Sequence, residues 1–233
     1  MENVPQITKH KVFADFIEGL RSLKYNVNWQ NVYCPDYGIP QSRRRLVLLA
    51  SRLGKIDLIA PTHTPGNYKT LRMAIGDLEP IEAGTESKKD RLHKSAILSK
   101  INLERMRNSV PGGSWRDWHE NLRANCHRKK SGRTYSSVYA RMEWKKPSST
   151  ITTQFFSFGT GRFGHPEQDR AISLREGAIL QTFPKKYRFV PPGSPVELKR
   201  LGRYIGNAVP VKLGEVIGKS IIKHLRNYYE KKA

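Results

Sequence analysis

Cysteine is scarce in this chain: Cys34 and Cys126 are the only two among 233 residues. A disulfide framework needs several cysteines at regular spacings, and a structural zinc site needs about four ligands. Two cysteines and scattered histidines do not supply those ligand spacings. The sequence therefore predicts two reduced thiols, no disulfide scaffold and no metal site.

Acidic residues are also few. The chain has 20 Asp and Glu against 42 Lys and Arg, which gives a net charge of +22 at pH 7. So large a positive charge favours encounter with a polyanion such as nucleic acid or an anionic membrane. No apolar run approaches the roughly 18 residues of a membrane span, and no basic segment followed by an apolar core marks the N-terminus. We therefore expect a cytoplasmic protein with no membrane partner.

The length allows one large domain or two small ones, and the first 62 residues have the pattern of alternating helix and strand. Residues 9–23 carry apolar side chains at helical spacing, residues 25–34 alternate apolar and polar, and residues 45–51 form a buried apolar run. Proline and glycine in residues 35–40 predict a loop between the two strands. This order is typical of the end of an α/β sheet.

From about residue 60 the chain changes to short segments rich in turn formers. Residues 91–165 hold 15 Lys and Arg against 4 Asp and Glu, a net charge of +11. Aromatic residues are interleaved with this charge: Trp115, Trp118, Tyr135, Tyr139 and Trp144. Alone, the pattern favours a solvated basic surface whose aromatic residues belong to the core. Together with the charge of the whole chain, it favours a nucleic-acid groove.

Two helices are predicted near the C-terminal end. Ser173 and Glu176 form a capping box that begins a helix over residues 173–182, which Pro184 ends. Residues 211–229 have an amphipathic pattern and predict a closing helix. Before it, Gly206 and Asn207 predict a turn that leads backbone amides and a short polar side chain toward a small ligand, although an ordinary helix entry explains the same residues.

The segment GIPQSRRR, residues 38–45, carries three arginines into the start of a buried strand. Alternate residues of an extended chain point the same way, so Arg43 and Arg45 should share a face and Arg44 should point elsewhere. The planar fork of arginine fits phosphate oxygens and the carbonyl edge of a base. The pair therefore suits a nucleotide, and the alternative is a strand-edge cluster paired with acidic residues.

These segments stand in the order seen in the C5-cytosine DNA methyltransferase family, which the chain resembles closely. The similar segments are ENV at residues 2–4, PQSRRR at 40–45, KPSSTITT at 146–153, GRFGHPEQDRAISLREGAILQTFP at 161–184 and GNAVPVKLG at 206–214. They run from near the first residue to near the last. Only residues 66–144 are unplaced, where members of the family differ because each reads its own DNA sequence.

The resemblance implies a fold and a division into domains. We expect an α/β fold, comprising the C-terminal part of a Rossmann-like, S-adenosylmethionine-dependent methyltransferase domain plus a small irregular target-recognition domain. Residues 1–62 would belong to the catalytic domain, residues 63–198 to the target-recognition domain, and residues 199–233 to a C-terminal helix that returns to the catalytic domain.

The resemblance also implies a reaction and its residues. A cysteine thiolate adds to C6 of a flipped cytosine, and C5 then takes a methyl group from S-adenosyl-L-methionine. By resemblance Glu2, Arg43 and Arg45 are catalytic: Glu2 faces N3 of the base, Arg45 contacts its carbonyl edge, and Arg43 supports Arg45. Asn207, Ala208 and Val209 would line the cofactor pocket. Gln41, Arg43, Thr150, Thr152 and Arg162 would contact double-stranded DNA.

Two parts of the family pattern have no counterpart in the sequence. Neither Cys34 nor Cys126 stands between a proline and a glutamine, as the family nucleophile does, and no glycine-rich cofactor turn is found. We therefore expect the chain alone to be inactive, as the C-terminal part or subunit of a methyltransferase of a restriction-modification system. A split enzyme completed by a complementary subunit, and a fragment of a single-chain enzyme, both remain open. A cognate restriction endonuclease is a further expected partner, and the alternative function is a non-catalytic, sequence-specific DNA-binding remnant.

Overall fold

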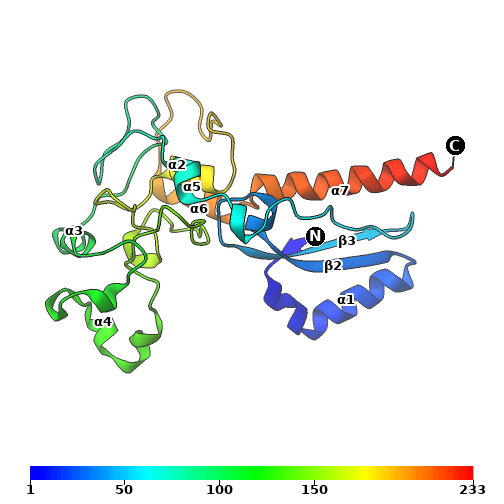
Figure 1. Cartoon of the computed structure of the whole chain (residues 1–233), viewed down its shortest axis with the longest axis horizontal. Coiled ribbons are helices and arrows are strands. Elements are labelled where there is room, and N and C mark those ends of the chain that lie inside the picture. The colour runs from blue at the N-terminus through cyan, green and yellow to red at the C-terminus, as the bar shows by residue number, and fades with distance from the viewer. Residues whose placement is uncertain (233) are drawn as a thin grey trace.

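The computed structural model describes residues 1–232 and has two parts, a small sheet between two helices and an irregular region of loops and short helices (Figure 1). The fold is α/β with a small sheet. No helix among residues 1–232 is both long enough and apolar enough to span a membrane.

The sheet has three strands in the order β1-β3-β2, and both pairings are antiparallel. The strands are β1 (Glu2–Asn3), β2 (Asn26–Tyr33) and β3 (Arg44–Ser51). In the register, Glu2 lies opposite Val47 and Trp29 lies opposite Leu48. The two predicted strands are confirmed, and β3 is central because its apolar run is buried on both faces.

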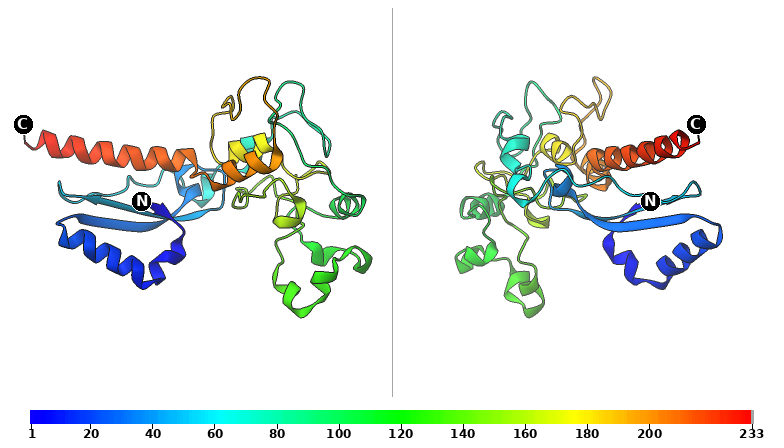
Figure 2. Two further views of the ribbon diagram at one scale, coloured as in Figure 1. Left: turned by 180° about the vertical axis from the view of Figure 1, so that it is seen from behind. Right: turned by 45° about the vertical axis from the view of Figure 1, so that its right-hand side comes forward.

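Alternate residues of β3 pack on two different helices. Leu46 and Leu48 contact a cluster with Phe13 and Ile17 of α1 (Lys11–Ser22) on one face. Val47 and Leu49 share a cluster on the other face with side chains of α7 (Val211–Glu230). Figure 2 shows the two helices on opposite sides of the sheet. Both helices were predicted from their periodicity, and the structure confirms them.

The irregular region contains five short helices and most of the 3₁₀ turns. The helices are α2 (Leu71–Ile75), α3 (Lys100–Arg107), α4 (Asn125–Arg128), α5 (Leu174–Leu180) and α6 (Leu198–Asn207). The 3₁₀ turns of the described chain are Pro5–Lys9, Cys34–Tyr37, Pro65–Asn67, Trp115–Asp117, Glu120–Leu122, Lys130–Thr134 and Phe158–Thr160.

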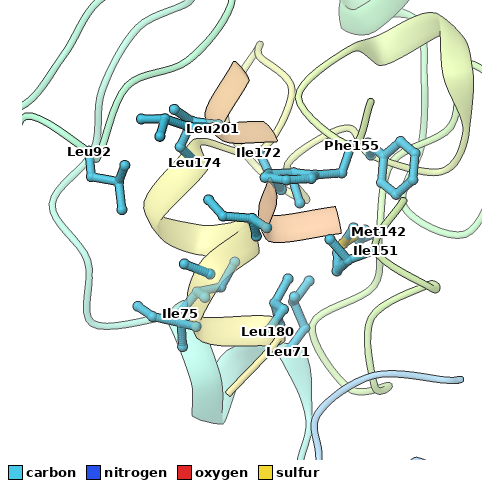
Figure 3. Close-up of a cluster of buried hydrophobic side chains, with 14 of the residues drawn as sticks. Leu71, Ile75, Leu92, Met142, Ile151, Phe155, Ile172, Leu174, Leu180 and Leu201 are labelled. Carbon is cyan, nitrogen blue, oxygen red and sulfur yellow. The ribbon is translucent and has the colours of Figure 1, made fainter. Parts of the chain in front are cut away.

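α5 lies at the centre of the largest hydrophobic core, which Figure 3 shows with side chains from α2, α5 and α6. The predicted capping box is present: the Ser173 hydroxyl accepts from the Glu176 backbone amide, and the Glu176 carboxylate accepts from the Ser173 amide. The same carboxylate binds Arg170 through two hydrogen bonds of 2.7 and 2.8 Å. This charge pairing outweighs the desolvation that favours the neutral acid, and it lowers the pKa of Glu176 to about 2.

Helix α6 was not predicted from the sequence. The packing of α6 bears on the division into domains. Leu201 and Ile205 of α6 lie in the core around α5, whereas Leu213 and Val216 of α7 pack on the sheet. The division into domains stays a prediction. This packing favours placing its second boundary at Pro210, between α6 and α7, rather than at residue 199.

The structure places most aromatic rings of the predicted nucleic-acid groove in the protein interior. Trp115 and Trp118 are 4% and 2% exposed and belong to a core with Met106 and Phe158. Only Tyr135, among the five aromatic residues of that pattern, is well exposed. The rings are buried because each lobe of loops needs an apolar core, and the basic side chains are left on its surface.

Candidate active site

A cavity of about 360 Å³ brings together four segments that are far apart in the sequence. It lies where the ENV residues, the arginines at the start of β3, residues 150–153 and the end of α6 meet. Its lining consists of residues 2–4, 43, 45, 150–153, 206 and 207. The three catalytic residues predicted from the resemblance therefore line one cavity.

Glu2 and Arg45 form an ion pair in the lining of this cavity. The Arg45 Nε atom lies 2.9 Å from the Glu2 Oε1 atom, and the two side chains are only 15% and 18% exposed. The pair is close enough for charge attraction but is not aligned for a hydrogen bond, because Glu2 Oε1 is buried without a hydrogen-bond partner among the described residues. A buried, unsatisfied carboxylate oxygen is expected at a site that receives a ligand.

Arg43 lies deeper than Arg45 and on the same side. It is 6% exposed, and its Nη1 atom donates to the Ile151 carbonyl at 3.0 Å. Burial and the neighbouring Arg45 charge lower the pKa of Arg43 to about 10. Arg44 is exposed and stacks on the Tyr33 ring at 4.6 Å. The predicted alternation of the three arginines is confirmed.

Gln41 holds this arginine segment from inside the protein. Its side chain is 0% exposed, and its Nε2 donates to the Leu180 carbonyl at 3.1 Å and to Gln181 Oε1 at 3.0 Å. Its Oε1 accepts from the Ile151 backbone amide at 3.0 Å. The prediction that Gln41 contacts DNA is therefore wrong: its amide is fully used in the interior, where it aligns residues 150–153 with the arginines.

Gln181 extends this connection to α6. Its Nε2 donates to the carbonyls of Ile205 at 2.8 Å and Ala208 at 3.1 Å. These carbonyls lie at the C-terminal end of α6, where a helix leaves backbone acceptors without intrahelical donors. The sequence pattern did not mark Gln181 as a positioning residue. The available signal was an amide side chain directly after the last turn of α5.

The remaining predicted DNA-binding residues lie in different places. Thr150 and Thr152 line the cavity, and the Thr150 hydroxyl donates to the Ser42 carbonyl at 2.7 Å. Arg162 is half-buried outside the cavity lining, and its Nη1 donates to the Gly113 carbonyl at 2.8 Å. The structure thus brings the two threonines, but not Arg162, to the catalytic candidates.

Asn207 is the last residue of α6 and lines the cavity beside Thr152. Gly206 permits this approach, because a Cβ at that position would lie 2.3 Å from the Thr152 carbonyl oxygen. The Asn207 amide makes no hydrogen bond within the described part of the chain, and the next residues, Ala208 and Val209, are half-buried and exposed. An available amide beside an accessible apolar residue fits one wall of a pocket for an organic cofactor.

The two thiols lie elsewhere. Cys34 is 0% exposed, and burial raises its pKa to about 11. Cys126 is exposed on α4, and neither cysteine lines the cavity of Glu2. No three His, Cys, Asp or Glu side chains within residues 1–232 converge in a way that could hold a metal ion.

The residues of this cavity also lie within the region that matches known proteins. The profile of the C-5 cytosine-specific DNA methylase family matches residues 1–223, from the segment of Glu2 through most of α7. The chain belongs to this family.

Two curated relatives are bacterial Type II enzymes. The chain is 54% identical over 234 residues to Type II methylase M.HgiDII of Herpetosiphon aurantiacus, covering 99% of this chain and 66% of that protein. It is 32% identical to a Type II methyltransferase of Haemophilus parahaemolyticus, covering 96% of this chain and 56% of the relative. The chain thus spans a little over half to two thirds of the length of these relatives.

Solved structures support the fold. A putative DNA modification methyltransferase encoded within a prophage of E. coli superposes with a TM-score of 0.62 at 22% identity, covering 98% of this chain and 68% of that one. The DNMT2 of Spodoptera frugiperda gives a TM-score of 0.58 at 17% identity, covering 95% and 65%. At these identities the likeness concerns the fold alone.

Proposed function

We propose that this chain is the C-terminal part, or a subunit, of a DNA (cytosine-5-)-methyltransferase in a restriction-modification system. The reaction transfers a methyl group from S-adenosyl-L-methionine to C5 of a cytosine flipped out of double-stranded DNA. The observation that carries the proposal is the Glu2–Arg45 pair, which lines one cavity with Arg43 and Asn207. The Type II relatives support the same assignment.

The Glu2–Arg45 pair has the donors and acceptors that a cytosine edge requires. Cytosine presents a carbonyl oxygen next to N3 and an amino group, which accept and donate in turn. Arg45 offers guanidinium donors to the carbonyl oxygen, and the adjacent Glu2 carboxyl holds a proton at N3 and accepts from the amino group. A proton at N3 makes C6 electrophilic, so the acid assists nucleophilic addition there. Arg43 adds positive charge behind the pair, 6% exposed and little screened by water.

Asn207, Ala208 and Val209 form one wall of the proposed cofactor pocket, with the Asn207 amide available for a polar group of the ligand. When bound, S-adenosyl-L-methionine supplies an electrophilic methyl group. The chain's own contribution is to hold the base edge with Glu2 and Arg45 at the same cavity that Asn207 lines. Positioning of this kind accounts for a large part of many catalytic rate enhancements.

We propose that the thiolate nucleophile and the main cofactor turn come from a complementary polypeptide, either a separate subunit or another part of the same enzyme. Cys34 is buried with a raised pKa, and Cys126 lies on a different lobe. The chain alone should therefore not methylate DNA. Exposed apolar side chains on the two helices that flank the sheet give such a polypeptide a surface to cover. The exposed fractions are greatest at Val12, Phe16, Ile222 and Tyr229.

The sheet and α7 then represent the C-terminal part of a Rossmann-like catalytic domain, and the irregular region represents the target-recognition domain. The net charge of +22 supports double-stranded DNA as the substrate. Thr150 and Thr152 remain DNA-contact candidates at the cavity, and Arg162 remains one outside it. A cognate restriction endonuclease would complete the system, and the expected location is the cytoplasm.

The test is co-expression of the chain with a polypeptide that carries the cysteine loop and the cofactor turn, followed by bisulfite sequencing of the host DNA. We expect 5-methylcytosine at one sequence only when both polypeptides are present. Glu2→Gln should reduce the methylation rate about 10²- to 10⁴-fold because the proton donor is lost. Glu18→Gln removes the same charge from the exposed face of α1 and should leave the rate unchanged.

A non-catalytic DNA-binding remnant is the second candidate, and it is favoured by the absence of a cysteine from the cavity lining. Methylation in the co-expression experiment rules it out. Tight DNA binding without methylation in every combination tested would support it, and would overturn the proposed enzyme.

A further inference from the structure

Residues 114–138 form a separate lobe of the irregular region, which we term the basic lobe. It holds α4 and three 3₁₀ turns and projects away from the sheet in all three views (Figures 1 and 2). Trp115 is buried within the lobe and stacks on the ring of His127, with 4.3 Å between the ring centroids. The indole Nε1 is already used, because it donates to the Tyr135 carbonyl at 2.7 Å.

Trp115 and His127 are among the residues that line a cavity of about 600 Å³. Three arginines and one acid surround the two rings: Arg116, Arg123, Arg128 and Glu120. Backbone carbonyls anchor two of the guanidinium groups, since Arg123 Nη2 donates to the Arg116 carbonyl at 2.9 Å and Arg128 Nη2 donates to the Glu120 carbonyl at 2.8 Å. The cavity is separate from the one that contains Glu2.

Two polar atoms of this cavity lining are buried without a partner among the described residues, Arg123 Nε and His127 Nδ1. His127 as a whole is 5% exposed. Leaving a buried donor without an acceptor destabilises a protein, and more so when the donor is charged. Two such atoms in one cavity indicate that a ligand acceptor completes their hydrogen bonding.

The charge of the cavity identifies the kind of acceptor. The guanidinium groups of Arg123 and Arg128 line the cavity with one carboxylate, that of Glu120. The nearest approach of this carboxylate to Arg123 is 3.9 Å, which leaves an excess of positive charge. A neutral base edge does not compensate such an excess, whereas a phosphate oxygen does and accepts from several donors at once. The rings do not offer a stacking platform for a base, because Trp115 is 4% exposed.

We infer that the cavity of the basic lobe binds a backbone phosphate of DNA, with Arg123 and His127 as its hydrogen-bond donors and Arg128 as a supporting charge. The inference rests on the proposed function, since DNA is the substrate proposed above. Burial and the charge of Arg105 lower the pKa of His127. The ring is therefore neutral at pH 7, and it donates from Nδ1 in the tautomer protonated there.

The test measures binding of the 233-residue chain to fluorescent duplexes of unrelated sequence, by anisotropy across a range of salt concentrations. Loss of one phosphate contact lowers the slope of log K against log salt by about 1. We expect this change for Arg123→Gln on every duplex, with about tenfold weaker binding at low salt. His127→Phe keeps a ring on Trp115 and removes Nδ1, and it should weaken binding with little change of slope.

Lys130→Gln is the matched control, because Lys130 is exposed in the same lobe and does not line the cavity. Thermal melting checks that each variant is folded. Equal effects of Arg123→Gln and Lys130→Gln, or no effect of either, would overturn the inference. An effect of Arg123→Gln confined to one duplex sequence would also overturn it and would indicate a base contact.

The outcome is separable from that of the proposed function. In the co-expressed enzyme, Arg123→Gln should raise KM for DNA and leave kcat unchanged, because a backbone contact binds ground state and transition state equally. Salt-dependent binding that responds to Arg123→Gln without any methylation would leave the phosphate site standing and would refute the enzyme. Methylation with no response to Arg123→Gln would do the reverse.

Discussion

Replacing Gln181 with leucine tests whether buried amides hold the cavity together. The leucine side chain has a similar volume but removes the donor to the carbonyls of Ile205, Gly206 and Ala208. It also removes the oxygen that accepts from the Gln41 amide. Two of these partners keep a second hydrogen bond: Gln41 still donates to the Leu180 carbonyl, and the Ile205 carbonyl still accepts from the Ala208 amide. The Gly206 and Ala208 carbonyls lose their side-chain donor.

The magnitude follows from this count. Two carbonyls lose this donor and two further bonding arrangements are weakened, so Gln181→Leu should lower the free energy of unfolding by about 2–3 kcal/mol. Urea denaturation measures the change, with the m-value unchanged if the native fold persists. A loss below about 0.5 kcal/mol would refute the reasoning, because that is the range of ordinary surface substitutions.

Gln181→Glu provides an isosteric control with an internal check. At neutral pH its carboxylate oxygen would face the carbonyls of Ile205 and Ala208, so this variant should be less stable than the leucine variant. Lowering the pH protonates the introduced acid, which then donates to a carbonyl, so its deficit relative to the natural protein should shrink. A deficit that stays constant with pH would contradict the assigned direction of these hydrogen bonds.

A double-mutant cycle with Gln41→Leu measures the contact itself. The two side chains hydrogen bond directly at 3.0 Å, and each also has other partners. Residues in one hydrogen-bond network show coupling energies of about 0.5–3 kcal/mol. Additive effects would show that the two glutamines act independently, which would remove the proposed link between the arginine segment and α6.

The remaining predictions concern stability and thiol access. Gly206→Ala should destabilise the protein by about 1–3 kcal/mol, because its Cβ would lie 2.3 Å from a backbone carbonyl oxygen. The Cβ of Gly214→Ala in α7 meets no atom within 4 Å, so this variant should stabilise the protein by about 0.5–1 kcal/mol. Equal urea midpoints for the two variants would contradict both expectations. Burial lowers the pKa of His165 from 6.5 to about 4, so the folded state resists protonation of this ring. The free energy of unfolding should therefore fall by roughly 2 kcal/mol from about pH 7 to about pH 5. His165→Gln should flatten this pH profile, and an unchanged slope would refute the assignment. Iodoacetamide should label exposed Cys126 in the native protein and Cys34 only after unfolding. Peptide mass spectrometry identifies the labelled cysteine, and labelling of Cys34 in the native protein would contradict its burial.

Several elements could be predicted because their signals are local. The apolar spacing of Phe13 and Ile17 defined α1, and the Ser173–Glu176 capping box defined the start of α5. The two-residue repeat of a strand placed Arg43 and Arg45 on one side. α6 was missed because Gly202 and Gly206 lower its intrinsic helix propensity. Their lack of side chains is needed by Phe156 and the backbone at Thr152, which pack against them.

The sequence by itself determined the sheet helices, the alternation of the arginines, the positive charge and the family resemblance. Each of these depends on neighbouring residues or on the order of segments along the chain. Only the tertiary structure decided that Gln41 lies in the interior, that Gln181 joins it across 140 positions, and that Trp115 is a core residue beside a basic cavity. Burial and long-range hydrogen bonding depend on which distant segments pack together, because a polar or aromatic side chain has the same local signal whether it is covered or exposed.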